Sequence, residues 1–113
     1  MDGQQRDSFD VGAAVIAPIT SAARVFALAQ RRLTPTNTLD RLAMAQQDYP
    51  KAAAVLREAA EAFRVGLYYQ TLAGGDLVSP DTLGKLDHLL LKTAFASIER
   101  FLEFTLATFI SRA

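Results

Sequence analysis

The sequence predicts an all-α fold, a bundle of four to five helices in which the last helix is long. Alanine supplies twenty of the 113 residues and leucine fifteen, and both are strong helix formers. Valine and isoleucine, which favour strands, together supply ten. No short stretch alternates between apolar and polar positions with turn signals on both sides, as a half-buried strand would.

Twelve basic residues balance twelve acidic ones, and the chain has no cysteine. A net charge of zero argues against a nucleic-acid-binding protein, which usually carries a clear basic excess. The lack of cysteine excludes disulfide bonds and thiolate metal sites. A chain of this length fits one domain and can bury a core without such cross-links. We therefore expect a compact cytoplasmic protein that binds no nucleic acid.

The polar residues 1–9 are predicted to form a flexible leader, and residues 10–113 a single helical-bundle domain. The leader lacks the basic start and the cleavage pattern of a signal peptide. Polar chain ends of this kind are commonly poorly ordered, so the domain boundary is placed at residue 10.

Residues 11–29 are almost continuously apolar, and this run is just long enough to cross a bilayer core. Pro18 interrupts the run, however, and Arg24 would lie well inside the hydrocarbon, where an arginine is costly. We therefore predict a buried helix from Pro18 to Arg32, because proline suits the first helical turn, and no membrane partner.

The middle of the chain is divided by prolines and glycines. Residues 34–37 are a predicted turn, because they contain a proline and the helix-capping residues Thr and Asn. A short helix is predicted over Thr38–Gln47 and a third over Pro50–Leu72. Gly74 and Gly75 then match the left-handed conformation that commonly ends a helix.

One long helix is predicted from Lys85 to Ser111, because this stretch contains no helix breaker. Its polar stripe consists of Lys85, His88, Lys92, Glu99 and Glu103. The broad remaining surface carries Leu86, Leu90, Phe95, Ile98, Leu102, Leu106 and Phe109. An apolar arc this wide needs neighbours on two sides, so the helix is expected at the centre of the bundle.

No catalytic or metal-binding group of residues is predicted in this chain. His88 is the one histidine, and its helical neighbours Gly84 and Lys92 are not metal ligands. A single histidine without a nucleophile elbow gives no hydrolase triad. The Gly74-Gly75 pair lacks the lysine and the hydroxyl of a phosphate-binding loop. We therefore predict no catalytic residue, no metal ligand and no cofactor here.

Arg24 and the helix start at residues 36–42 are the two candidate functional features. Arg24 is the one charged residue between Asp10 and Arg31, and an unpaired arginine inside the protein would be costly. The exposed N–H groups of a helix start form a natural anion site, which Arg24 and Arg41 could complete for a phosphate. Alternatively, Arg24 hydrogen-bonds this turn and locks two helices together. The sequence leaves both interpretations open.

Several segments, in a fixed order, carry a resemblance to a known family. They are Phe9-Asp10, Ala23-Arg24-Val25-Phe26-Ala27-Leu28, Thr36-Asn37-Thr38-Leu39-Asp40-Arg41-Leu42, Ala62-Phe63 leading to Gln70, and Pro80, Leu83, Leu86 and Leu90-Leu91-Lys92-Thr93-Ala94-Phe95. Over about residues 9–110, the chain resembles the C-terminal substrate-binding domain of a family of bacterial nucleotidyltransferases.

The resemblance implies a non-catalytic accessory domain that binds or positions the substrate of a nucleotidyltransferase in bacterial signalling. Its partner would be a catalytic nucleotidyltransferase domain, similar to that of PII-protein uridylyltransferases, in cis or in trans. Sensor domains of the CBS or cyclic-nucleotide type often precede that catalytic domain. Mg²⁺ and a nucleoside triphosphate are expected only there, because its Gly-Ser turn and paired aspartates are absent from this chain. The matching candidate residues for substrate binding are Arg24, Asn37, Thr38, Arg41 and Gln70.

Three departures from the family pattern weaken the case for anion binding near Gln70. The approach to this glutamine is Gly66-Leu67-Tyr68-Tyr69, where the family commonly has arginines. Gly84 stands where a serine is expected, and Leu102 where a glutamine is expected.

An alternative function is a dimerisation or docking module that binds no ligand, with a possible homodimer. Its support is the end of the last helix, where Phe101, Phe104, Phe109 and Ile110 present more aromatic surface than a small bundle readily covers. A third alternative is a toxin-type ribonuclease, which would need an arginine four to six residues before His88. Residues 81–84 contain none.

Overall fold

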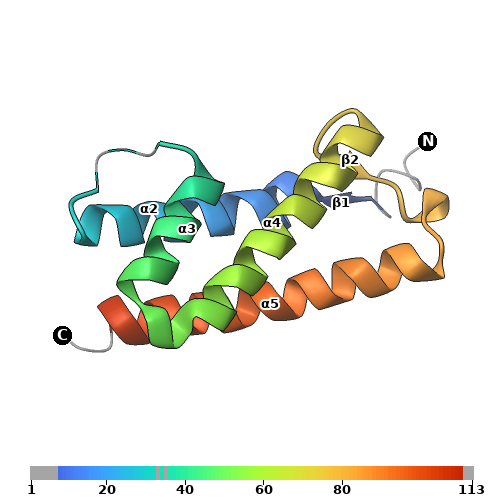
Figure 1. Ribbon diagram of the computed structural model, residues 1–113. Coiled ribbons are helices and arrows are strands. Elements are labelled where there is room, and N and C mark those ends of the chain that lie inside the picture. The colour runs from blue at the N-terminus through green and yellow to red at the C-terminus, as the bar shows by residue number, and fades with distance from the viewer. Residues whose placement is uncertain (1–7, 33, 35, 111–113) are drawn as a thin grey trace.

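The computed structural model describes residues 8–32, 34 and 36–110, and it confirms the predicted all-α fold with a long last helix. In chain order the elements are β1 (Phe9–Asp10), the π-helical turn η1 (Gly12–Ile16), α2 (Ala17–Ala29), α3 (Thr38–Asp48), the 3-10 turn η2 (Pro50–Ala52), α4 (Ala53–Ala73), β2 (Leu77–Val78), the 3-10 turn η3 (Pro80–Thr82) and α5 (Lys85–Phe109). Helix α5 runs along most of the 47 Å long axis (Figure 1). It packs against α4 and α2, while α3 packs against both α2 and α4.

The core is centred on Phe26 of α2, which is 1% exposed. The ring of Phe26 stacks on Phe101 and Phe104, with centroid distances of 5.9 and 5.8 Å. Phe109 and Tyr49 meet the same ring edge-on at 4.8 and 5.3 Å. The aromatic side chains at the end of α5 are therefore in the core. The expectation of an uncovered surface is therefore wrong for these aromatic side chains, because α2 and Tyr49 supply the ring contacts that the α5 sequence alone does not show, whereas Ile110 is 62% exposed as expected.

The first helical segment begins earlier than predicted. Helical backbone starts before Gly12, and the N–H of Ala17 bonds to the carbonyl of Gly12, five residues back. Pro18 lies in the first turn of α2, just after this wider turn, so the proline does not start the helix. By length and composition, Gly12–Ala29 is the one helix of the described residues that could cross a membrane. In this fold one of its faces belongs to the protein core, through Val15, Ile19, Ala23 and Phe26 among others.

A small antiparallel sheet, which the sequence analysis did not predict, joins the segment before η1 to the connection between α4 and α5. Phe9 pairs with Val78, and Asp10 with Leu77. Phe9, placed in the predicted leader, is thus part of β1, and its ring contacts Phe95 edge-on at 6.2 Å. Residues 1–7 of that leader lie outside the described residues. A strand of two residues is too short to show an alternating pattern, so the residue pattern did not predict this sheet.

The other helix boundaries lie within three residues of the predictions. Helix α2 ends at Ala29 instead of Arg32, because Arg31 has a φ of 56°, and α4 begins at Ala53, after the 3-10 turn that starts at Pro50. Helix α3 ends at Asp48 and α4 at Ala73, each one residue beyond its predicted end. The predicted glycine stop is confirmed, because Gly74 has a φ of 73° and Gly75 donates to the carbonyl of Gln70. Helix α5 is assigned to Phe109, and the predicted end at Ser111 lies outside the described residues.

The predicted apolar surface of α5 is rotated relative to the buried one. Of the seven residues predicted for that surface, Ile98 is buried, whereas Leu86, Leu90, Phe95 and Leu106 are exposed. The buried stripe consists of Leu91, Ala94, Ser97, Ile98, Phe101 and Thr105. It is narrow, because α5 lies against α4 and α2 on one side only (Figure 1). The expected central position of α5 is therefore wrong.

Gly66 of α4 allows a close approach between α4 and the η1 turn. A Cβ atom added at Gly66 would lie 2.6 Å from Cγ1 of Val15, whose side chain is fully buried. Because Val15 is branched and surrounded by the core, it has no space into which to move. Gly66 therefore sets how closely these two segments pack.

We predict that Gly66→Ala destabilises the protein. Overpacking costs about 1–3 kcal/mol, and the helix propensity of alanine offsets up to about 1 kcal/mol of it. The expected net loss in the free energy of unfolding is thus about 1 kcal/mol, measured by urea denaturation. Gly75→Ala is the matched control, since a Cβ there meets nothing within 4 Å. Equal midpoints for the two variants would contradict this account of the packing.

Tyr69 and Asp87 connect the end of α4 to the start of α5. The hydroxyl of Tyr69, a residue 1% exposed, donates to Oδ1 of Asp87 at 2.5 Å. Oδ2 of Asp87 accepts from the backbone N–H of Gly84 at 2.8 Å and so caps α5 from within its first turn. Burial and the bond to Asp87 raise the pKa of Tyr69 to about 12, and the same bond lowers the pKa of Asp87. Gly84 thus starts the helix without the serine expected there.

We predict that Tyr69 makes the stability fall at alkaline pH. Its pKa is about 12 in the folded state against 10.0 ordinarily, so the folded state holds the proton more tightly. This stabilisation is complete below the ordinary pKa and is lost as the pH rises through the folded pKa. In Tyr69→Phe, the free energy of unfolding should depend less on pH across that interval, as measured by urea denaturation. Parallel pH profiles for the two proteins would show that the Tyr69 proton makes no difference.

Candidate functional site

An open groove of about 490 Å³ lies on the outer face of α2, and we call it the polar groove. Its floor is formed by small residues of η1 and α2, and its walls by hydroxyl, amide and carboxylate groups. The lining consists of Asp10, Gly12, Ala13, Ile16, Ala17, Thr20, Ser21, Gln70 and Asp76. Because the opposite face of α2 is in the core, the helix holds this floor rigidly.

Gln70 and Asp76 form one end of the polar groove. Nε2 of Gln70 donates to Oδ1 of Asp76 at 2.6 Å, while the Asp76 backbone carbonyl accepts from the N–H of Val11 at 2.8 Å. The Asp76 carboxylate also lies directly above Gly12, where an added Cβ would be 2.6 Å from its Cγ. Glycine at position 12 therefore lets the turn after α4 close over η1. Gln70, which the sequence analysis named as a candidate site residue, therefore lines this groove.

Thr20 and Thr38 meet at the α2–α3 contact, next to the other end of the groove. Oγ1 of Thr38 donates to Oγ1 of Thr20 at 3.2 Å. Thr38 is 8% exposed, so Thr20, which lines the groove, is the member of the pair that a ligand can reach. Thr38 thus does not line the groove but holds the side chain of Thr20, which does.

Asn37 caps α3, as the sequence predicted for a helix start. Its Oδ1 accepts from the N–H of Asp40 at 2.9 Å, and its Nδ2 donates to Oδ2 of Asp40 at 2.8 Å. The two side chains therefore satisfy each other and place a carboxylate in the first turn. A negative charge at that position disfavours a bound anion. This geometry supports the structural role of Asn37, and the phosphate site stays a prediction.

Arg41 lies at a different place, beside the ion pair of Arg32 and Asp48. These three residues line a cavity of about 10 Å³ between α2 and α3, which has room for about one water molecule. Arg32 binds Asp48 through both Nε and Nη2, with 3.1 Å between Nε and Oδ2. That hydrogen bond raises the pKa of Arg32 above its ordinary value. Arg41 is therefore next to a structural ion pair and does not line the polar groove.

Arg24 is exposed on the outer face of α2. None of the residues that the structure describes forms a hydrogen bond or an ion pair with it. It follows Thr20 by four positions and Ser21 by three, so it continues the face of α2 that forms the groove floor. The interpretation that Arg24 locks two helices together has no support in this geometry, because its side chain points toward solvent.

The structure therefore brings together only part of the predicted site. Gln70 lines the groove, Thr38 supports it, and Arg24 extends its floor, whereas Asn37 and Arg41 belong to the α2–α3 contact. Sequence reasoning missed Asp10, Thr20, Ser21 and Asp76. Asp10 belongs to β1 and Asp76 directly precedes β2, so the two side chains come together only because these strands pair.

The groove lining offers neutral hydrogen-bonding groups and two carboxylates. Thr20, Ser21 and Gln70 can donate to and accept from a bound hydroxyl or amide. Oδ1 of Asp10 accepts from the N–H of Ala13 at 2.9 Å and caps η1. Among residues 8–32, 34 and 36–110, no group of three His, Cys, Asp or Glu side chains could hold a metal ion. The arrangement is suited to holding a polar molecule.

Comparison with known families gives one match that covers nearly the whole chain. Residues 1–109 match the family described as "Putative nucleotidyltransferase substrate binding domain". No curated protein and no solved structure matches the chain.

We predict that Arg24→Ala leaves the stability of the protein unchanged within about 0.5 kcal/mol, as is usual for an exposed, unpaired side chain. Arg32→Ala, just after the end of α2, removes the same type of side chain and is the comparison. It should lower the melting temperature because it leaves Asp48 without its ion-pair partner. Thermal denaturation followed by circular dichroism measures both. A melting temperature for Arg24→Ala as low as that of Arg32→Ala would restore the helix-locking interpretation.

Proposed function

The chain belongs to the family of nucleotidyltransferase substrate-binding domains, and from this premise we propose that it holds the acceptor substrate in the polar groove. The family description implies association with the catalytic part of a nucleotidyltransferase. In this proposal the catalytic part supplies the reaction, and the present chain supplies the position of the acceptor. The groove with Gln70 on its wall is the observation that carries the proposal.

The polar groove has the features that such a role needs. It is open to solvent, so that an acceptor can enter and a catalytic part can reach it. Its floor of Ala13 and Ala17 leaves room, while Thr20, Ser21 and Gln70 offer hydrogen bonds of defined direction. Because Asp76 holds Gln70 at 2.6 Å, the Gln70 amide is oriented before a ligand arrives.

Arg24 is proposed to act at the edge of this groove. It has no partner among the described residues, and it lies one helical turn beyond Thr20. A nucleotidyl transfer brings phosphate groups to the acceptor, and a free guanidinium is a strong partner for phosphate. Arg24 could therefore steer the phosphates of a nucleotide delivered by the catalytic part.

The wider setting of this function also remains a proposal. We propose a role in bacterial signalling in the cytoplasm, next to sensor domains of the CBS type. Mg²⁺ and the nucleoside triphosphate would be bound by the catalytic part, in cis or in trans. Of the residues that suggested the competing docking or dimerisation module, Phe101, Phe104 and Phe109 pack around Phe26, whereas Ile110 is exposed.

The proposal is tested with the catalytic part joined to this chain or mixed with it. Nucleoside triphosphates labelled at the α-phosphate are incubated with a cell extract, and the molecule that becomes labelled is then used as the acceptor. Gln70→Ala should raise the KM for this acceptor about five- to tenfold, the value of one hydrogen bond, with little change in kcat. Ser21→Ala should act in the same direction.

Glu61→Ala is the control, because Glu61 is exposed on α4 and does not line the groove. Its kinetic constants should equal those of the wild type. If Gln70→Ala and Ser21→Ala also keep the wild-type KM while remaining folded, the acceptor does not bind in the polar groove.

A further inference from the structure

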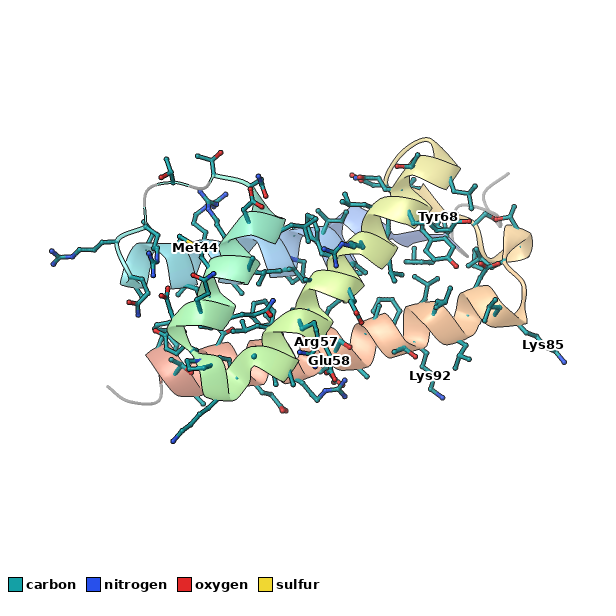
Figure 2. All side chains as sticks on the ribbon, viewed as in Figure 1. Met44, Arg57, Glu58, Tyr68, Lys85 and Lys92 are labelled. Carbon is teal, nitrogen blue, oxygen red and sulfur yellow. The ribbon has the colours of Figure 1, made fainter. Side chains whose placement is uncertain are left out.

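The outer face of α5 carries charges of opposite sign in its two halves. We define this outer face by six residues that lie away from the buried stripe: His88, Lys92, Phe95, Glu99, Glu103 and Leu106. All six are exposed, Phe95 to 39% and Leu106 to 55%. Lys85 and Lys92 project from α5 away from the other helices (Figure 2). The basic side chains thus precede Phe95 in the chain, and the acidic ones follow it.

The charges on this face have no ion-pair partners among the residues that the structure describes. None of the described residues forms an ion pair with Lys92, Glu99 or Glu103. Lys92 and Glu99 are seven positions apart, about 10 Å along a helix, so they do not pair with each other. Glu99 and Glu103 are four positions apart on the same face and repel each other weakly. A cationic partner surface would relieve this repulsion.

We propose that two copies of this chain associate through the outer faces of α5, with the two helices antiparallel. In the register centred between Phe95 and Ala96, Lys92 of one copy lies opposite Glu99 of the second copy, because both residues are equally far from the centre. His88 lies opposite Glu103 by the same rule. A two-fold interface makes each contact twice, so this single register forms two Lys92–Glu99 ion pairs.

The same register places apolar surface together near the two-fold axis. Phe95 of each copy lies beside the axis, and Leu106 of the second copy comes to the level of Lys85. An apolar groove of about 400 Å³ lies beside the axis, between α5, β1 and η3, and Phe95, Leu91 and Leu83 are among its lining residues.

The charge pattern also selects the antiparallel orientation. In a parallel pair, Lys92 would face Lys92 and Glu99 would face Glu99, and like charges at contact distance oppose association. Helices α2, α3 and α4 lie on one side of α5 (Figure 1), and Lys92 and Glu99 are exposed, so a second copy can approach them. Because the pairs are exposed, the association should be weak and sensitive to salt.

Sedimentation equilibrium of the 113-residue chain tests the proposal. At about 20 mM NaCl, where screening is weak, the apparent mass should rise above 12.3 kDa with concentration, and at about 500 mM it should stay near the monomer value. A monomer at about 1 mM protein in the low-salt buffer would overturn the proposal, because even a weak dimer is populated at that concentration.

Charge reversal tests the register. Lys92→Glu and Glu99→Lys should each weaken the dimer about tenfold, since each variant replaces two attractive pairs by two repulsive ones. The double variant Lys92→Glu/Glu99→Lys should restore the wild-type constant, and an equimolar mixture of the two single variants should associate better than either alone. Glu61→Lys, a reversal on the exposed face of α4, is the control and should have no effect.

Every other pattern counts against the proposal. A double variant as weak as the single ones would show that Lys92 and Glu99 do not face each other across the dimer. An equal loss in Glu61→Lys would show that net charge, and not this register, controls association. Circular dichroism of all variants confirms that the exposed substitutions leave the helices intact.

Discussion

The packing of four rings around Phe26 is the interaction on which the rest of the structure depends. Phe101, Phe104 and Phe109 come from the end of α5, and Tyr49 from the junction of α3 and α4. One side chain of α2 therefore fixes the positions of all the other helices at this end of the bundle. Because Phe26 is buried, the face of α2 that carries it cannot rotate, and the opposite face is held toward solvent.

The polar groove is a consequence of that fixed rotation. Ala13, Ala17 and Thr20 lie opposite the buried face of α2, where small residues leave a shallow floor. At one end of the groove, the turn after α4 folds back, and Asp76 can pass over Gly12 because no Cβ is present there. Gln70 is then held by Asp76 at the wall of the groove. The core packing and the glycine contact together produce the polar groove.

Helix α5 shows how one element can serve both the core and the surface. Its narrow buried stripe contains Leu91, Ala94, Ile98, Phe101 and Thr105, at spacings of three and four residues. The stripe is sufficient for packing against α4 and α2, so the opposite face is available for another purpose. On that face the charges are sorted by sign along the helix, which a monomer does not require. The proposed dimer would use the face that the bundle leaves uncovered, and the polar groove would stay open.

The sequence by itself determined the helical class, the α3, α4 and α5 segments, the glycine stop at Gly74 and the family to which the chain belongs. These features depend on local propensity, on capping and on residue order, which are properties of short segments. The tertiary structure decided which face of α5 is buried, where the aromatic side chains go, and which candidate residues share a site. Arg24, Arg41 and Gln70 looked alike as polar residues on helices, but only the packing places Gln70 in the groove and Arg41 beside Asp48. The physical reason is that helical rotation and long-range strand pairing are set by contacts between residues far apart in the chain, and a local pattern does not contain them.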